Sequence, residues 1–449
     1  MAAGGTFRRQ INTLAASPAA TPSPESRESE LASLTGVPFA PPRRRRPFGP
    51  LHEPLFRSLW VAAVVSYTGS WMQNVGAGWL MTSLTMSPLM VGLVQAANSI
   101  AVFLIVLPAG AIADVVDRRK FLLLTQLWMV AAAVVLGVLA FAGLVTPALL
   151  LLLTFLMGFG AVLNDPAWQA ITPEIVSREN FAAGIALNSA GFNVARAIGP
   201  ALGGLVIYSL GSGIAFLLNG VSFFGVIFFL YHWKSVPSPS TLQPGHMFRA
   251  MFDGFRHLRG SSVMHCVLVR SAVFSISASA LLALLPLLSH SFGCKGYGLM
   301  LGVFGTGSLI GAAILPFLRR NMSVDAVVAT STLIFAVATY AAGRQPSFLL
   351  FGLTLLIAGM AWIQILASLN VCAQTMSPSF MRARAISMYI LVLQGGFAVG
   401  AALWGAVAER LGMAASLRYA AVGLLGGVAV TFRFRLHPVP VEPNLIGMD

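Results

Sequence analysis

Apolar segments of roughly 20 residues, the length that crosses a bilayer's hydrocarbon core, recur from Leu55 to near the end of the chain. Lipid cannot hydrogen-bond an exposed backbone, so spanning segments must be helices or closed barrels, and long continuous apolar runs favour helices. We therefore expect an all-α membrane protein with twelve transmembrane helices. They are expected near residues 55–80, 88–112, 121–143, 147–166, 181–208, 213–233, 263–289, 297–318, 323–342, 347–371, 383–408 and 413–433.

Composition excludes several classes of function. Only 9% of the 449 residues are charged, against about 25% in soluble domains. The net charge of +14 does not indicate a nucleic-acid partner, because the basic residues lie between apolar runs. Three scattered cysteines show no metal or disulfide spacing, and no glycine-rich phosphate loop is followed by Lys-Ser or Lys-Thr. We expect no enzymatic activity, no cofactor and no metal.

The distribution of Lys and Arg predicts the orientation. One set of loops carries most of them, and the opposite set carries only Lys295, Arg344, Arg410 and Arg418. Both termini and the linker between the halves are therefore expected in the cytoplasm, and the chain is expected to be a monomer. We divide it into a disordered basic N-terminal tail (1–50), an N-terminal six-helix bundle (51–233), a linker (234–262), a C-terminal six-helix bundle (263–434) and a short tail (435–449). The linker is expected to form an amphipathic helix along the membrane surface, with a solvated connector as the alternative.

The two halves resemble each other weakly, which indicates a duplicated six-helix unit and two pseudo-symmetric bundles. The matching positions are residues 89–93 with 299–303, Gln169 and Pro173 with Gln374 and Pro378, and Gly191-Phe192 with Gly396-Phe397.

Three stretches carry a resemblance to a known family: GSWMQNVGAGW at 69–79, NDPAWQAITPE at 164–174 and ALNSAGFNVARAIGPALGG at 186–204. Over residues 50 to 435 the chain resembles the major facilitator superfamily, in particular its enterobactin-exporter-like branch, the transmembrane secretion effector family. The resemblance implies a secondary-active exporter in a bacterial cytoplasmic (inner) membrane. It would move a siderophore-like or drug-like amphipathic molecule by alternating access, with protons as the coupling ion. A lipid flippase, or a transporter-like sensor without transport activity, stays open as an alternative.

A charged hinge separates the second and third expected helices. The family pattern there joins Gly110, Asp114 and the basic pair Arg118 and Arg119. By resemblance, Asp114 holds the end of the second helix against the eleventh and so acts as a conformational gate. Asp117 replaces the usual glycine and adds a negative charge.

The fifth expected helix contains Gly199, Pro200, Gly203 and Gly204, which resemble the pattern of exporters in the superfamily. Glycines let helices approach closely, and proline removes a backbone donor. We expect a seam that opens and recloses; ordinary small-residue packing is the alternative. The family pattern has glycines where this chain has Ala186 and Ala195.

Charged residues inside helices are rare and need a reason. Arg196 could bind an anionic cargo group, or be tethered by Asn188 and Asn193. Asp165 is the best candidate for proton coupling, with a cap or a partner for loop arginines as the alternative. Arg270 is expected to reach the membrane surface with its long side chain.

Polar and aromatic residues that interrupt the apolar helices are candidates for the cargo cavity, although each could instead join two helices by a hydrogen bond. They are Tyr67, Trp71, Gln73, Asn74, Gln95, Asn98, Asn188, Asn193, Trp362, Gln364, Tyr389 and Gln394.

Overall fold

The computed structural model describes residues 48–177, 179–233, 262–344, 347–375 and 382–431. The expected N-terminal tail up to residue 47, the linker at 234–261 and the C-terminal tail lie outside the described residues. The boundaries of the two predicted bundles therefore remain predictions.

Twelve long helices run through the described residues, close to the twelve expected ones. In the first half they are α3 (Pro54–Leu84), α4 (Pro88–Val115), α5 (Arg118–Phe141), α6 (Pro147–Ile175), α7 (Phe181–Leu210) and α8 (Ser212–His232). In the second half they are α10 (Ser262–Leu288), α11 (Gly293–Asn321), α12 (Val324–Ala342), α13 (Phe348–Thr375), α14 (Arg382–Leu411) and α15 (Met413–Thr431). Two short 3-10 turns, η1 (Gly49–His52) and η2 (His290–Phe292), precede α3 and α11, and no strand occurs in these ranges.

Local chemistry sets several helix ends. Thr146 caps α6 by accepting a hydrogen bond from Leu149 N, and Pro147 occupies the first turn, where its missing N–H costs nothing. Gly211 has φ +85°, a left-handed conformation that other residues adopt only with strain. It lets α8 begin directly after α7, so the two helices form a tight hairpin.

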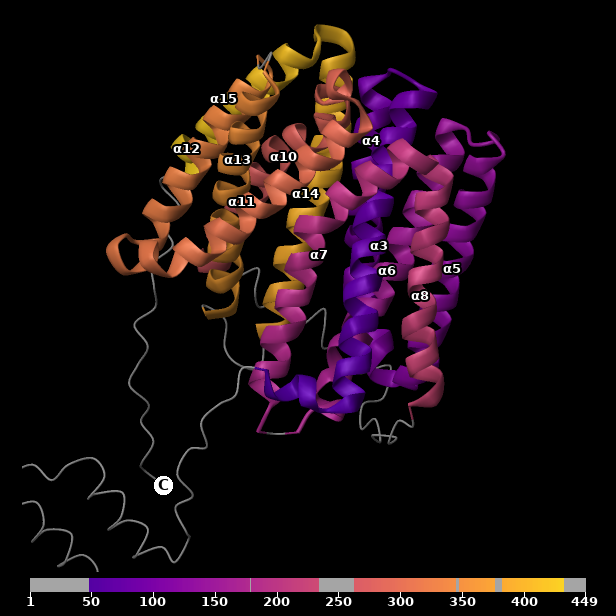
Figure 1. Cartoon of the computed structure of the whole chain (residues 1–449). Coiled ribbons are helices and arrows are strands. Elements are labelled where there is room, and N and C mark those ends of the chain that lie inside the picture. Colours follow the sequence, from indigo (N-terminus) through magenta and orange to yellow (C-terminus); the bar gives the residue numbers. More distant parts are fainter. Residues whose placement is uncertain (1–47, 178, 234–261, 345–346, 376–381, 432–449) are drawn as a thin grey trace, which may run out of the picture. The chain divides into compact units, whose positions relative to one another are not determined.

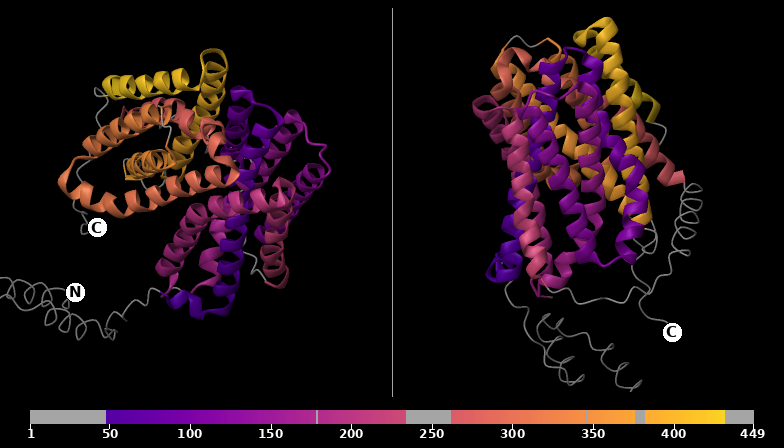
Figure 2. Two further views of the ribbon diagram at one scale, coloured as in Figure 1. Left: turned by 45° about the horizontal axis from the view of Figure 1, so that its top comes forward. Right: turned by 90° about the vertical axis from the view of Figure 1, so that its right-hand side faces the viewer.

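The helices form two bundles, α3–α8 and α10–α15, drawn in indigo to magenta and in orange to yellow (Figure 1). In the first bundle α3 packs against α7 and α8, and in the second α10 packs against α14 and α15. The contacts between the bundles come mainly from two helix pairs, α4 with α14 and α7 with α11. Figure 2 shows the same grouping from two other directions.

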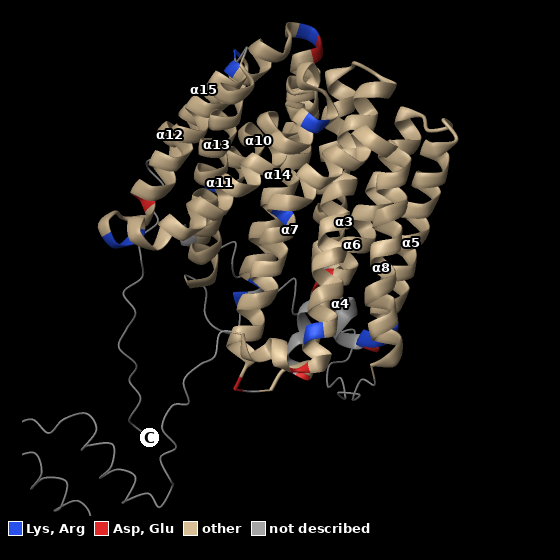
Figure 3. Cartoon of the chain, viewed as in Figure 1, with Lys and Arg blue, Asp and Glu red and all other residues tan. Residues whose placement is uncertain are grey.

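The surface is that of a membrane protein. Large apolar side chains are exposed in greater numbers than on the surface of a soluble protein. Examples are Phe228, Val337 and Leu349, which are 69%, 66% and 70% exposed. Charged residues lie near the helix ends and leave most of the helix middles uncharged (Figure 3). Ten described segments could cross a membrane by length and composition; one of them, Met264–Asn321, covers both α10 and α11, and α3 is not among them. The chain is therefore an all-helical multi-pass membrane protein, as expected.

Candidate functional site

A cavity of about 380 Å³ lies between the two bundles. We call it the central cavity; α3, α4, α6 and α7 form one side, and α10, α11, α13 and α14 form the other. Five of the predicted substrate or coupling residues line it: Trp71, Asn74, Asp165, Arg196 and Gln394. The cavity is also lined by Gln95, Asn98 and Trp362, which were predicted as cargo-cavity residues too. The volume falls within the roughly 300–1,000 Å³ typical of small-molecule sites.

Arg196 carries a positive charge into this cavity from the middle of α7. Its Nη2 lies 3.4 Å from Ser308 Oγ on α11, and its Cζ lies 6.0 Å from the centre of the Trp71 ring. Inserting an arginine at mid-membrane costs about 2.5–3.5 kcal/mol on insertion scales. Since the Ser308 contact is long, it offsets little of that cost, and the charge remains available to a ligand in the cavity.

Asp165 supplies the opposite charge from α6. It lines the cavity and is exposed to it. Within the described residues, no hydrogen bond or ion pair holds its carboxylate. Tyr67 lies close enough to interact electrostatically with Asp165, and its hydroxyl contacts the Trp168 side chain. The central cavity thus presents one cation and one carboxylate from neighbouring helices.

Aromatic rings form much of the opposite wall. Trp362 stacks on Phe397 with ring centres 5.1 Å apart, and Phe304 meets Trp362 edge-on at 5.8 Å. Tyr297 also lines the cavity. Sequence reasoning did not select Tyr297, Phe304 or Phe397 for the cavity, because nothing in the sequence distinguishes them from the other aromatics on these helices.

The predicted α7 seam packs against two different helices. A Cβ added at Gly199 or Gly203 would clash with α3, at 2.6 Å from Trp71 Cβ and 2.8 Å from Met72 Cα. A Cβ at Gly204 would lie 3.0 Å from Gly298 Cα on α11. Gly204 therefore faces the second bundle, whereas Gly199 and Gly203 let α7 pack closely against α3 of the first bundle.

The contact at Gly204 and Gly298 joins the bundles near the end of α7 and the beginning of α11. A Cβ at Gly298 would lie only 2.5 Å from Pro200 O. The α4–α14 pair meets in the same way, since a Cβ at Gly405 would lie 2.9 Å from Pro88 O. Backbone-to-backbone contacts thus join the two bundles at the end where α4 begins and α7 ends.

Several predicted cavity residues instead join helices, which is the alternative that the sequence left open. Asn219 Nδ2 on α8 donates to the buried Gln73 Oε1 at 2.5 Å, and Ser331 Oγ on α12 donates to Gln364 Oε1 at 2.8 Å. Tyr389 Oη on α14 donates to Leu366 O on α13 at 3.1 Å, and Tyr67 on α3 meets Phe192 on α7 edge-on at 5.3 Å. Asn193 Nδ2 instead donates within α7, to Ser189 O at 2.8 Å. Neither these five nor Asn188 lines the central cavity.

The charged hinge is only partly described. The side chain of Asp114 and the environment of Gly110 lie outside the described residues. Arg118 Nη1 forms an ion pair with Glu174 Oε1 at 2.6 Å, which ties the start of α5 to the end of α6. Arg119 donates to two carbonyls at the end of α8, Leu230 O at 2.7 Å and Tyr231 O at 2.6 Å. Cations are stabilised at a helix C-terminus, so Arg119 anchors a helix end.

One expectation was wrong. The Arg270 side chain does not end in solvent; it is 8% exposed and pairs with Asp325 on α12, with Nη2 to Oδ1 at 2.7 Å. The carboxylate at the start of α12 provides a closer partner than water at the interface. No group of three or more metal-binding side chains occurs in the described ranges.

Known proteins resemble this chain along most of its length. The family model for the transmembrane secretion effector matches residues 45–445. The enterobactin exporter EntS of Escherichia coli O1:K1 is 27% identical over 386 residues, covering 83% of this chain and 90% of the exporter, and the protein of that name from Shigella boydii serotype 18 gives the same figures.

Solved transporter structures share the fold at lower identity. The nucleoside transporter NupG superposes with a TM-score of 0.68 at 14% identity, covering 85% of this chain and 98% of that one. A bacterial homologue of the human lysosomal transporter Spinster, in an inward-facing and occupied conformation, gives a TM-score of 0.70 at 15% identity, with coverages of 86% and 97%. Both the relatives and the structural neighbours are transporters, not enzymes. The chain therefore belongs to the transmembrane secretion effector family and is a membrane transporter of the major facilitator type.

Proposed function

We propose that this transporter is an exporter that moves an amphipathic small molecule, siderophore-like or drug-like, out of the cytoplasm by alternating access. The central cavity is the observation that carries the proposal. It lies between two bundles, and it combines the Arg196 cation with an aromatic wall around Trp362. Such a site suits a cargo with flat apolar parts and an anionic or hydrogen-bonding group. The EntS relatives, which are named as enterobactin exporters, support a cargo of this kind.

The backbone contacts between the two bundles support alternating access. If both termini are cytoplasmic, as the Lys and Arg distribution predicts, the contacts at Gly298 and Gly405 lie toward the outer face of the membrane. Releasing cargo outward then requires α7 to separate from α11, and α4 from α14. Glycine contacts suit this step, because they bring backbones together without interlocking side chains.

Protons are the proposed coupling ion, and Asp165 is the proposed carrier. A carboxylate that faces a cavity between the bundles can meet water from either side as the bundles move. Its position beside the cargo site lets proton and cargo influence each other. Replacing Asp165 by Asn is expected to abolish transport driven by a pH gradient while leaving exchange of cargo down its own gradient.

At the hinge, we propose that Asp114 stabilises the cytoplasmic gate together with Gly110, while Arg118 and Arg119 fix the loop between α4 and α5. Asp114→Asn is then expected to loosen the gate and to raise the accessibility of cysteines introduced on the cytoplasmic side. Unchanged efflux together with unchanged accessibility would contradict this role. The proposed working form is a monomer in a bacterial cytoplasmic membrane.

The cargo site can be tested with everted membrane vesicles and two probes, enterobactin and the aromatic cation ethidium. The variants are Arg196→Ala, which removes the cavity's cation, and Pro200→Ala, which changes the seam. We expect uptake of at least one probe by the unmodified protein. Pro200→Ala should lower the uptake of either probe, whereas Arg196→Ala should lower the uptake of enterobactin but not that of the cation ethidium. The proposal is wrong if the unmodified protein moves neither probe, or if both variants move it at the original rate.

A further inference from the structure

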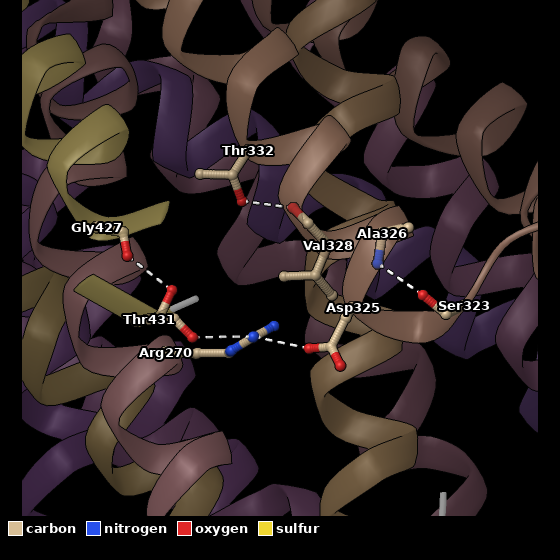
Figure 4. Close-up of polar contacts among 8 residues, drawn as sticks. All are labelled: Arg270, Ser323, Asp325, Ala326, Val328, Thr332, Gly427 and Thr431. Carbon is tan, nitrogen blue, oxygen red and sulfur yellow. Dashed lines mark hydrogen bonds and ion pairs between the residues drawn. The ribbon is translucent and has the colours of Figure 1, made fainter. Parts of the chain in front are cut away.

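A second cavity lies inside the α10–α15 bundle, apart from the central one. We call it the side chamber; its volume is about 640 Å³, larger than that of the central cavity. Its walls come from α10, α12 and α15, with the end of α11 and the middle of α13 completing them. Figure 4 shows polar contacts among residues of its lining, which come from α10, α12 with the residue before it, and α15.

Arg270 of α10 lines this chamber and is 8% exposed. One of its nitrogens, Nη2, donates to Asp325 at 2.7 Å and to Thr431 O at 3.1 Å (Figure 4). Its Nε is buried and has no hydrogen-bond partner among the described residues. Buried donors of this kind normally have an acceptor, so the guanidinium retains unused capacity for one.

Arg319, near the end of α11, repeats this pattern. Its Nη2 makes two long contacts with α13, at 3.3 Å from Ala367 O and 3.3 Å from Ser368 Oγ. Its Nε is also buried without a partner in the described part of the chain. Arg270, Arg319 and Asp325 all line the same chamber, which places their charges in one neighbourhood.

Among the described residues, the chamber therefore has two cations and one carboxylate in its lining, so this lining carries a net positive charge. A buried, incompletely compensated cation is unfavourable in a membrane protein, and a negatively charged ligand would relieve the imbalance. Two guanidinium groups with free N–H donors suit an acidic oxyanion, because arginine binds carboxylate and phosphate oxygens in a fork.

The rest of the chamber is apolar. Phe274, Val328, Ile365 and Leu424 contribute to its walls. The Phe274 ring packs 5.7 Å from Trp362, which lines the central cavity, so these aromatic rings stand between the two cavities. A small free anion would leave the apolar space unfilled, whereas a molecule with a hydrocarbon chain would fill it.

We propose that the side chamber binds an anionic amphiphile, with its acidic headgroup at Arg270 and Arg319 and its hydrocarbon chain against the walls of α10, α12 and α15. The site is distinct from the cargo site and does not depend on the proposed export. An acidic membrane lipid has this chemistry, and a free inorganic anion has only the headgroup part of it.

The test uses the purified full chain in an uncharged detergent. Binding of dioctanoyl phosphatidylglycerol, dioctanoyl phosphatidylcholine and inorganic phosphate is measured by titration calorimetry, with thermal melting as a second readout. The variants are Arg319→Gln and the double variant Arg270→Gln/Asp325→Asn, which removes the ion pair without leaving Asp325 uncompensated. Arg320→Gln is the matched control, because Arg320 is adjacent, exposed and absent from the chamber.

We expect phosphatidylglycerol to bind the unmodified protein and the Arg320→Gln control equally well. Loss of a charge-assisted hydrogen bond should weaken its binding about tenfold or more in each chamber variant. Equal binding of phosphatidylcholine would overturn the acidic-headgroup assignment, and an equal effect of inorganic phosphate would overturn the amphiphile. Unchanged affinity in both chamber variants would overturn the site itself.

Discussion

Replacing Gly298 with alanine is expected to force apart the two bundles where α7 meets α11. The added methyl group would lie 2.5 Å from Pro200 O and 2.7 Å from Gly204 Cα. Both are backbone atoms of the opposing helix, so no side chain can rotate away to make room. Ordinary contact begins at 3.4 Å, and the helices must therefore separate by about 0.9 Å at this point.

The size of the effect follows from the cost of overpacking. Adding a methyl group to a tightly packed site typically costs about 1–3 kcal/mol. If the strain exists only while the seam is closed, the same energy shifts the balance between closed and open seams. A shift of that size corresponds to roughly a 5- to 150-fold change in the ratio of the two states.

A native cysteine reports on this seam. Cys294 is 5% exposed, and its carbonyl oxygen would lie 2.9 Å from a Cβ placed on Gly204. With Cys266 and Cys372 replaced by serine, maleimide labelling follows Cys294 alone. Its labelling rate should rise in Gly298→Ala in proportion to the population of the open seam.

Gly426→Ala is the matched control, because a methyl group there meets nothing within 4 Å. Gly426 is also helical, so both substitutions share the gain in helix propensity. The control should label like the parent protein and melt at the same temperature or slightly higher. Equal labelling and equal melting temperatures for Gly298→Ala and the control would refute the idea that backbone contact closes the seam.

Two further predictions concern stability. Burial raises the pKa of Glu53, but hydrogen bonds from Asn180 and Ser177 outweigh this effect and leave that pKa below its ordinary value of 4.5. These bonds stabilise the fold above about pH 4.5, and their contribution is lost as the pH falls through the lowered pKa. Glu53→Gln should therefore lower the melting temperature at pH 7 and remove this part of the acid sensitivity. An unchanged melting temperature at pH 7 would contradict a stabilising role for these hydrogen bonds. Asn219→Leu leaves the buried Gln73 amide unpaired and should lower the free energy of unfolding, measured by chemical denaturation, by about 1–3 kcal/mol. The double variant Asn219→Leu/Gln73→Leu should recover part of this loss, and no recovery would contradict the pairing.

The helices were predictable because lipid imposes a simple rule. A segment that crosses the membrane must be helical and apolar over a known length. The expected helix at 213–233 and the observed α8 (Ser212–His232) differ by one residue at each end. Predicted and observed helix ends differ more where helices extend beyond the apolar segment. One example is α3, which continues to Leu84 rather than ending near residue 80.

The site was predictable only in part. A polar residue inside an apolar helix is unusual wherever it points, so the sequence could not separate Asn74, which faces the central cavity, from Gln73 beside it, which binds Asn219. The difference is one helical position, about 100°, and it depends on how the helices pack. The partner of Arg270 was missed for a related reason, because Asp325 is 55 residues away and the pair forms only when α10 meets α12.

The central claim is that cargo crosses only when the two bundles separate at the α7–α11 seam. A cysteine pair tests it directly, because a Cβ on Gly302 would lie 3.5 Å from Ala201 Cβ across the seam, the separation found in disulfides. Within the first bundle, a Cβ on Gly220 would lie 3.6 Å from Ala133 Cβ, which provides a matched pair that does not cross it.

In a background without native cysteines, transport of the responsive probe is measured after oxidation and again after reduction. We predict that oxidising Ala201→Cys/Gly302→Cys stops transport, that reduction restores it, and that Ala133→Cys/Gly220→Cys transports in both states. Full transport with the disulfide across the seam formed would contradict the account.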